Sequence, residues 1–295
     1  MNDVTRGEQY RRMVESIDQL PSLPSIVTRL VQVVNSPDTS AEDAAGVIEK
    51  DPALTSKMLR LANSAFYGIP RTISSVSSAV VILGFNTIKS LVLSASVVRM
   101  FPSGGGKGDT FDRRRFWKHS IVCGLAARSI TRALMSVKMM DPESSFCAGI
   151  LHDIGKLVFE QYMHEEYVGT CSHAADKGIA LVKAESEVLG ITHTEVGRML
   201  ADKWALPSEL EASIVSHHNP SGGGKVADLV TTVHLANRIA HSVGAGLWDG
   251  EAVSEEWDKA RALLKIDDAA YERILGTVTR DLETSDEFFT IISAS

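Results

Sequence analysis

The segment AGILHDIGKL at residues 148–157 places a histidine and an aspartate side by side within an apolar stretch. Polar and charged groups that leave water without partners destabilise a fold, so buried ones are normally matched by hydrogen-bonding groups or a metal ion. His152 and Asp153 therefore predict either a metal site with a chemical role or the structural remnant of one.

The composition is that of an ordinary globular protein. The 295 residues are enough for one large domain or two modest ones, and 44% of them are hydrophobic and 23% charged. The formal net charge of −7 argues against a general nucleic-acid-binding protein, which usually carries a basic excess.

Several features favour a cytoplasmic protein without membrane association. The first residues, MNDVTRGEQYRRMVES, are polar and unlike a signal peptide. No segment approaches the roughly 20 apolar residues of a membrane span. The three cysteines, Cys123, Cys147 and Cys171, are odd in number and lack metal-binding spacing, which indicates reduced thiols.

Helical periodicity dominates the chain. Asp51 before Pro52 is typical of a helix start, and the apolar residues that follow share one helix face: Leu54, Met58 and Leu61. No alternating strand pattern of useful length is present, so the sequence predicts an all-α fold. Residues 88–101 are the one stretch whose composition also suits a strand.

Two glycine-rich segments, at residues 102–108 and 221–225, are typical of flexible connectors. The first separates a histidine-free part from a part that contains all nine histidines. We therefore expect an N-terminal helical lobe over residues 1–101, a linker over 102–108, and a second helical lobe with a C-terminal helical extension over 109–295.

Further histidines lie on or beside predicted apolar helix faces. His119 shares a face with Phe116 and Cys123, and His193 follows a capping pattern formed by Thr192 and Glu195. His217 and His218 end an apolar helix, and a polar stripe follows at His234, Asn237, Arg238 and His241.

Each histidine alone is more often a hydrogen-bonded core residue than a ligand. Several imidazoles on core-facing helices must find partners together, however. We expect one pocket to contain the following side chains: His119, His152, Asp153, His193 and at least one of His217 and His218. Imidazole and carboxylate donors suit Fe, Mn, Zn or Ni.

The order H…HD…H…HH, with the run HDIGK, resembles the HD superfamily of metal-dependent phosphohydrolases, and especially its HD-GYP branch, which hydrolyses cyclic dinucleotides. The whole chain is more similar to the HDOD family, the HD-related output domain of bacterial signalling proteins. This similarity covers roughly residues 17–220 and includes LPSLPSIVTRLVQVV, IEKDPALTSKMLRLANSAFYG, FCAGILHDIGKL and SIVSHHNP.

The resemblance implies an HD-like fold in the C-terminal lobe and a set of metal ligands. The matching positions are His119, His152, Asp153, His193, His217 and His218, with Asn237 where an aspartate is expected. Lys156 matches a lysine that helps to hold phosphate and is a candidate catalytic residue; in a hydrolase, His119 or a member of the HD pair would be the general base. The GYP segment that should follow the histidine pair is missing, because the chain continues as HHNPSGGGK.

Two functions remain open at this point. The favoured one is a bacterial signal-transduction module that acts mainly through contacts with signalling proteins and retains part of an HD-type metal site. The alternative is a metal-dependent phosphohydrolase acting on a nucleotide or cyclic dinucleotide, with a nucleotide or phosphate as ligand. Because Asn237 brings no negative charge, we expect one weakly held metal or none, and no turnover of cyclic dinucleotides.

Overall fold

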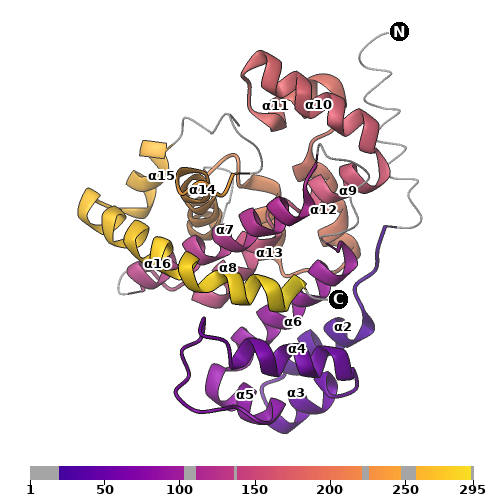
Figure 1. Ribbon diagram of the computed structural model, residues 1–295, viewed down its shortest axis with the longest axis vertical. Helices are drawn as coiled ribbons and strands as arrows, with labels where there is room; N and C mark the ends of the chain where they lie inside the picture. Colours follow the sequence, from indigo (N-terminus) through magenta and orange to yellow (C-terminus); the bar gives the residue numbers. More distant parts are fainter. Residues whose placement is uncertain (1–19, 103–110, 136–137, 221–225, 247–256, 294–295) are drawn as a thin grey trace.

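The computed structural model describes residues 20–102, 111–135, 138–220, 226–246 and 257–293, without the side chains of 284 and 285. Within these residues the protein consists of fifteen helices, α2 to α16, and contains no strand (Figure 1). The predicted all-α fold is confirmed.

Five helices precede the first predicted connector, and we call them the N-terminal lobe: α2 (Ser25–Val34), α3 (Ala41–Ile48), α4 (Pro52–Ala62), α5 (Val76–Leu83) and α6 (Phe85–Met100). Local sequence signals determine where several of them begin. The Asp51 side chain accepts a hydrogen bond from the Leu54 backbone N–H at the start of α4. Ser40 and Asp43 form a reciprocal capping box at the start of α3.

Residues 88–101, whose composition also suited a strand, are helical and lie almost entirely in α6. Most of this helix is buried, with Leu91, Val92 and Val97 fully inaccessible to solvent. A helix that is apolar on nearly every face is a core helix, and packing on several sides outweighs the weak strand preference of its valines.

A sharp turn joins α5 to α6. Gly84 has φ of 86°, a conformation that residues with a side chain rarely adopt, and the two helices are bent by 119° relative to each other. Among the described residues no single helix combines the length and apolar composition of a membrane span. The α5–α6 pair, taken together, satisfies that test by length and composition alone.

The second lobe, which we call the histidine lobe, contains the helices that carry the candidate site. They are α7 (Arg113–Leu134), α8 (Pro142–Leu151), α9 (Ile154–Tyr162), α10 (His164–Lys177), α11 (Leu181–Val188), α12 (His193–Lys203), α13 (Ser208–Ser216) and α14 (Ala227–Ser242). The long helix α7 is central and packs against α8, α14 and α16. Gly124 and Gly149 allow α7 and α8 to approach closely, since a Cβ on Gly149 would lie 2.7 Å from backbone atoms of Gly124.

The two lobes share one continuous hydrophobic core. Helix α6 packs on α8, and the C-terminal helices α15 (Trp257–Leu264) and α16 (Asp268–Ser293) follow α14. Helix α16 runs across both lobes and contacts α4, α6 and α7 (Figure 1). Phe288 of α16 lies 4.6 Å from Phe66, ring centroid to centroid, and Arg128 of α7 lies 4.0 Å above the same Phe66 ring.

The predicted connectors at 102–108 and 221–225 lie, apart from residue 102, outside the described residues. The division into 1–101 and 109–295 stays a prediction. The extensive contacts of α6 and α16 indicate that any two lobes are packed as one body rather than joined only by a linker.

Candidate metal centre

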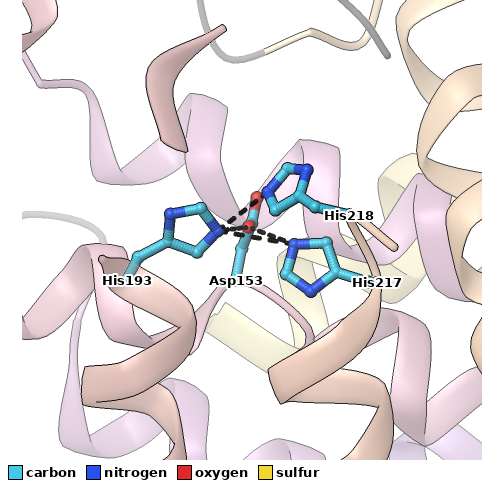
Figure 2. Close-up of side chains that lie close together, drawn as sticks. All are labelled: Asp153, His193, His217 and His218. Atoms are coloured by element: carbon cyan, nitrogen blue, oxygen red, sulfur yellow. Dashed lines mark hydrogen bonds and ion pairs between the residues drawn. The ribbon is translucent and has the colours of Figure 1, made fainter. Parts of the chain in front are cut away.

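The histidines and the aspartate predicted from the sequence meet at one point of the histidine lobe. They are His119 from α7, His152 and Asp153 from the turn between α8 and α9, His193 from the start of α12, and His217 and His218 from the end of α13. Figure 2 shows the carboxylate of Asp153 directed towards three imidazole rings. The expected convergence is confirmed; that these side chains bind a metal remains a prediction.

The potential donor atoms form two groups that share Asp153. One group contains Asp153, His193, His217 and His218, and the other contains His119, His152 and Asp153. Within each group all donor atoms lie within 4.8 Å of one another. The two carboxylate oxygens are divided between the groups, because Oδ1 faces His193 and His217 whereas Oδ2 faces His119 and His152.

The four-residue group has the spacing of ligands around a small cation. Tetrahedral ligands that each lie about 2.1 Å from a zinc-like ion are about 3.4 Å from one another. Asp153 Oδ1 lies 3.3 Å from His193 Nε2 and 3.4 Å from His217 Nε2. His193 Nε2 lies 3.4 Å from His217 Nε2 and 3.0 Å from His218 Nε2.

The hydrogen bonds of the outer ring nitrogens leave the inner ones free to accept a cation. His119 Nδ1 lies 2.9 Å from the Ala245 carbonyl oxygen, and His152 Nδ1 lies 2.7 Å from that of Gly149. His217 Nδ1 lies 3.0 Å from the carbonyl oxygen of Ile214. A carbonyl can only accept, so each Nδ1 donates its proton. In the neutral rings of His119 and His217, Nε2 then presents a lone pair to the centre.

His193 is oriented by a buried carboxylate. Its backbone N–H donates to Glu185 Oε2 over 2.8 Å, and its Nδ1 donates to the same oxygen over 2.6 Å. Tyr167 donates to the other oxygen of Glu185 over 3.1 Å. The predicted capping box of Thr192 and Glu195 is confirmed and fixes the helix start that carries His193. A carboxylate behind a ligating histidine is typical of metal sites.

Within the described part of the chain, the centre contains buried polar atoms that make no hydrogen bond, although one of them, Asp153 Oδ2, forms an ion pair with Lys156. Among the described residues, four such atoms lack a hydrogen bond of ordinary geometry: His119 Nε2, His152 Nε2 and both carboxylate oxygens of Asp153. Unmatched buried groups of this kind are costly in a fold, and here lone pairs and a carboxylate face one another. Residues of these types and in this arrangement fit a divalent transition metal.

Charge interactions shift the pKa values of the pair His152 and Asp153 in opposite directions. Burial alone would raise the pKa of Asp153, but His152 and Lys156 outweigh it and hold the pKa well below its usual value. Burial would lower the pKa of His152, and the adjacent Asp153 carboxylate instead raises it well above the ordinary value. In the metal-free protein Asp153 is therefore ionised and His152 is protonated. The proton on His152 takes up a nitrogen that a metal in the three-residue group would need.

The imidazoles of His119, His217 and His218 are neutral at physiological pH. Burial, reinforced by His152, lowers the pKa of His119 well below its usual value. Burial lowers the pKa of His217 to about 3, and burial with the neighbouring His217 and His193 lowers that of His218 as well. Neutral imidazole is the form that binds metals, so these rings need lose no proton on binding.

Lys156 lies one helical turn after Asp153 and is directed at the same carboxylate. Its Nζ lies 2.8 Å from Asp153 Oδ2, and the residue is 2% exposed. The lysine thus adds positive charge on the side of Asp153 that faces His119 and His152. The phosphate contact expected of Lys156 from the resemblance remains a prediction.

Helix α14 carries two polar side chains that bear on the site, Asn237 and His241, and His241 lies beside His119. Asn237 is partly buried, and its Oδ1 lacks a hydrogen-bond partner among the described residues. The ring of His241, one turn later, lies 5.1 Å from that of His119. Burial, with smaller effects of Lys156, lowers the pKa of His241 to about 4. Coordination by Asn237 stays a prediction, and His241 is a further candidate donor.

The sequence analysis assigned no role at the metal centre to two residues, His241 and Glu185. His241 was noted only as part of a polar stripe. Glu185 carried a usable signal, since Leu181, Ala184 and Glu185 lie at i, i+3 and i+4 and form the buried face of α11. An acidic residue on such a face needs a buried partner, but the sequence does not say that the partner is His193.

The glycine of HDIGK allows α9 to pass close to the start of α12. A Cβ on Gly155 would lie 2.0 Å from the carbonyl oxygen of His193 and 2.9 Å from the Gly197 nitrogen. Both contacts are with backbone atoms, which cannot rotate away. Gly155 therefore sets the distance between Asp153 and His193.

Comparison with known proteins places this site in a family. A family model described as HDOD domain matches residues 20–220. An uncharacterized protein from Treponema pallidum (strain Nichols) is 26% identical over 276 residues, which cover 93% of this chain and 51% of that protein. The chain thus spans about half the length of the curated relative that it matches.

Two solved structures are similar to this chain in both sequence and fold. The first is an HDOD domain protein of unknown function from Geobacter sulfurreducens, which is 26% identical, with 98% of both chains covered and a TM-score of 0.75. The second, from Shewanella amazonensis SB2B, is provisionally named a phosphohydrolase. It is also 26% identical, with 95% of this chain and 96% of that chain covered and a TM-score of 0.71.

We expect Gly155→Ala to destabilise the protein by about 3 kcal/mol or more, because the added methyl group overlaps backbone atoms of α12. The substitution should also reduce metal affinity by moving His193 away from Asp153. Urea unfolding and metal titration measure the two effects. Gly169→Ala in α10 is the matched control, since nothing lies within 4 Å of its Cβ position. Equal stabilities of the two variants would contradict the close-packing argument.

The metal-free protein should lose stability as the pH falls below about 6.5. Four imidazoles have a lowered pKa in the folded state (His119, His217, His218 and His241) and one, His152, has a raised pKa. The unfolded chain then binds more protons than the folded one, so the free energy of unfolding falls with decreasing pH.

Even one net proton corresponds to about 1.4 kcal/mol per pH unit. Urea midpoints of chelator-treated protein between pH 7.5 and 5.0 test this, with His173→Ala as a control because His173 is paired with Glu187 at the surface. A midpoint that does not change over this range would show that the imidazoles titrate normally.

Proposed function

Because this chain belongs to the HDOD family, whose model matches residues 20–220, we propose that it is a regulatory module whose state depends on one divalent transition metal bound by the buried histidine–aspartate cluster. The observation that carries the proposal is the four-residue group of Asp153, His193, His217 and His218. Four of its six donor-to-donor distances are 3.0 to 3.4 Å, as expected around a single tetrahedral ion, and all six are within 4.8 Å.

The charge of the cluster's side chains supports the binding of one metal ion rather than two. Asp153 supplies the only carboxylate of the two groups, so two dications would leave a large uncompensated positive charge in a poorly solvated site. Lys156 already neutralises Oδ2, the oxygen that faces the three-residue group. We infer that Lys156, with a protonated His152, takes the electrostatic place of a second cation.

Burial supports a regulatory rather than a catalytic role. His119 is 1% exposed, Asp153, His193 and His217 are 0% exposed, and only His218 of the four-residue group is partly exposed. Two-metal phosphodiester cleavage requires both ions to contact the substrate and the attacking water. A single ion enclosed by these side chains would instead fix the relative positions of the helices that bear them.

A route from the cluster to the N-terminal lobe exists through α8. This helix ends just before His152, and it packs against α6. Ser90 of α6 donates a hydrogen bond to the Glu143 carbonyl oxygen of α8 over 3.0 Å. Metal binding at one end of α8 would therefore influence the packing of α6, and through it the helices that we propose contact partner signalling proteins.

The alternative function is a metal-dependent phosphohydrolase. A specific observation favours it, since two donor groups bridged by one carboxylate are typical of two-metal hydrolases. The provisional name of the Shewanella protein points in the same direction for that protein. In this alternative a second ion would displace Lys156, which would then contact phosphate.

Two measurements on the full chain separate these functions. Adding Mn²⁺ or Zn²⁺ to metal-free protein should raise the free energy of unfolding by roughly 3 kcal/mol at a hundredfold excess over Kd. It should also slow hydrogen exchange in α8 and α6. Asp153→Asn, which keeps the shape of the side chain but removes its charge, should abolish both responses.

Hydrolysis of bis(p-nitrophenyl) phosphate and cyclic di-GMP with Mn²⁺ or Fe²⁺ should not exceed that of Asp153→Asn. Turnover that depends on Asp153 would establish the hydrolase instead. A wild-type protein that neither contains nor gains a metal would refute the proposed regulatory role.

A further inference from the structure

A second site is present at the junction of the two lobes, away from the metal cluster. It is a cavity of about 170 Å³ bounded by α2, α6, α8 and the turn between α12 and α13. The lining is predominantly apolar and includes Val27, Val31, Leu93, Cys147, Trp204 and Leu210. None of the candidate metal ligands contributes to it.

The cavity is lined by one positively charged side chain, that of Lys89. Lys89 of α6 is partly buried and lines the cavity, and among the described residues no carboxylate lies within ion-pair distance of it. Its charge reaches the buried end of the cavity: burial raises the pKa of the Cys147 thiol to about 12, and Lys89 acts against that rise.

The cavity also contains one acidic residue, Glu209, whose charge is better compensated. Glu209 lies in the first turn of α13, where the positive end of the helix dipole stabilises a carboxylate. Lys89 lies in α6 and has no comparable compensation. The charge that the cavity can still satisfy is therefore that of an anion.

The volume limits the size of the occupant. An engineered apolar cavity of about 150 Å³ binds benzene, so about 170 Å³ is enough for one aromatic ring. We propose that this cavity binds a small carboxylic acid with a single aromatic ring, with the ring against the apolar lining and the carboxylate paired with Lys89.

The position of the cavity connects it to the metal cluster. The turn from Trp204 to Pro207 joins α12, which begins at His193, to α13, which ends just before His217. Trp204 donates its indole N–H to the Pro21 carbonyl oxygen over 2.6 Å, and Ala205 has φ of 48°, which is strained for a residue with a side chain. An occupant that shifts this turn would change the distance between His193 and His217, a consequence that rests on the proposed function.

The binding site is tested on metal-free full-length protein by ¹⁹F NMR titration with 4-fluorobenzoate, 4-fluorotoluene and 4-fluorobenzylamine. We expect the acid to bind at least tenfold more tightly than the amine. Lys89→Met should remove this preference, whereas Lys50→Met, at an exposed lysine outside the lining, should retain it. Val31→Phe should fill the cavity and abolish binding of all three probes.

Hydrogen exchange locates the site independently of any variant, because 4-fluorobenzoate should protect the amides of 204–210. No binding of the acid, unchanged binding in Val31→Phe, or tighter binding of the amine would each overturn the proposal. The titration needs no metal, so its failure is distinct from failure of the proposed metal-dependent function.

Coupling between the cavity and the metal cluster is measured by repeating the same titration with saturating Mn²⁺. Because coupling is reciprocal, a severalfold change in the affinity for 4-fluorobenzoate would show that the two sites communicate. Equal affinities would overturn the connection through α12 and α13.

Discussion

The carboxylate of Asp153 imposes the main constraint on this structure. It is buried among imidazole rings whose inner nitrogens all face it, and the outer nitrogens of His119, His152 and His217 are held by backbone carbonyl groups. The positions of the helix ends follow from this arrangement, because α8, α9, α12 and α13 must each stop or start within a few ångströms of one carboxylate. A cation at that point converts mutual repulsion of lone pairs and carboxylate into attraction.

The same carboxylate supports our proposal of one metal rather than two. Its oxygens face different groups, and Lys156 is already paired with the oxygen on the His119 and His152 side. The expectation of a single metal was first based on the neutral amide of Asn237. The structure supplies a stronger reason, since a resident lysine and a protonated imidazole already provide positive charge where the second ion would bind.

The features that the sequence predicted are those encoded locally. The capping residues Asp51 and Thr192 with Glu195 act within one helical turn, and the helix starts follow them. The convergence of the histidines was predictable because buried imidazoles need common partners. The contacts that could not be predicted join distant segments. Glu185 behind His193 and the crossing at Gly155 depend on how helices cross, which local periodicity does not specify.

The position of the metal tests the central claim most directly. Crystals grown with Mn²⁺ should show one strong anomalous peak, within about 2.3 Å of Asp153 Oδ1 and of the Nε2 atoms of His193, His217 and His218. Lys156 should remain on Oδ2. Two equally occupied peaks bridged by Asp153, with Lys156 displaced, would contradict the single-metal account and favour a two-metal hydrolase. The absence of any peak at this cluster would refute metal binding altogether.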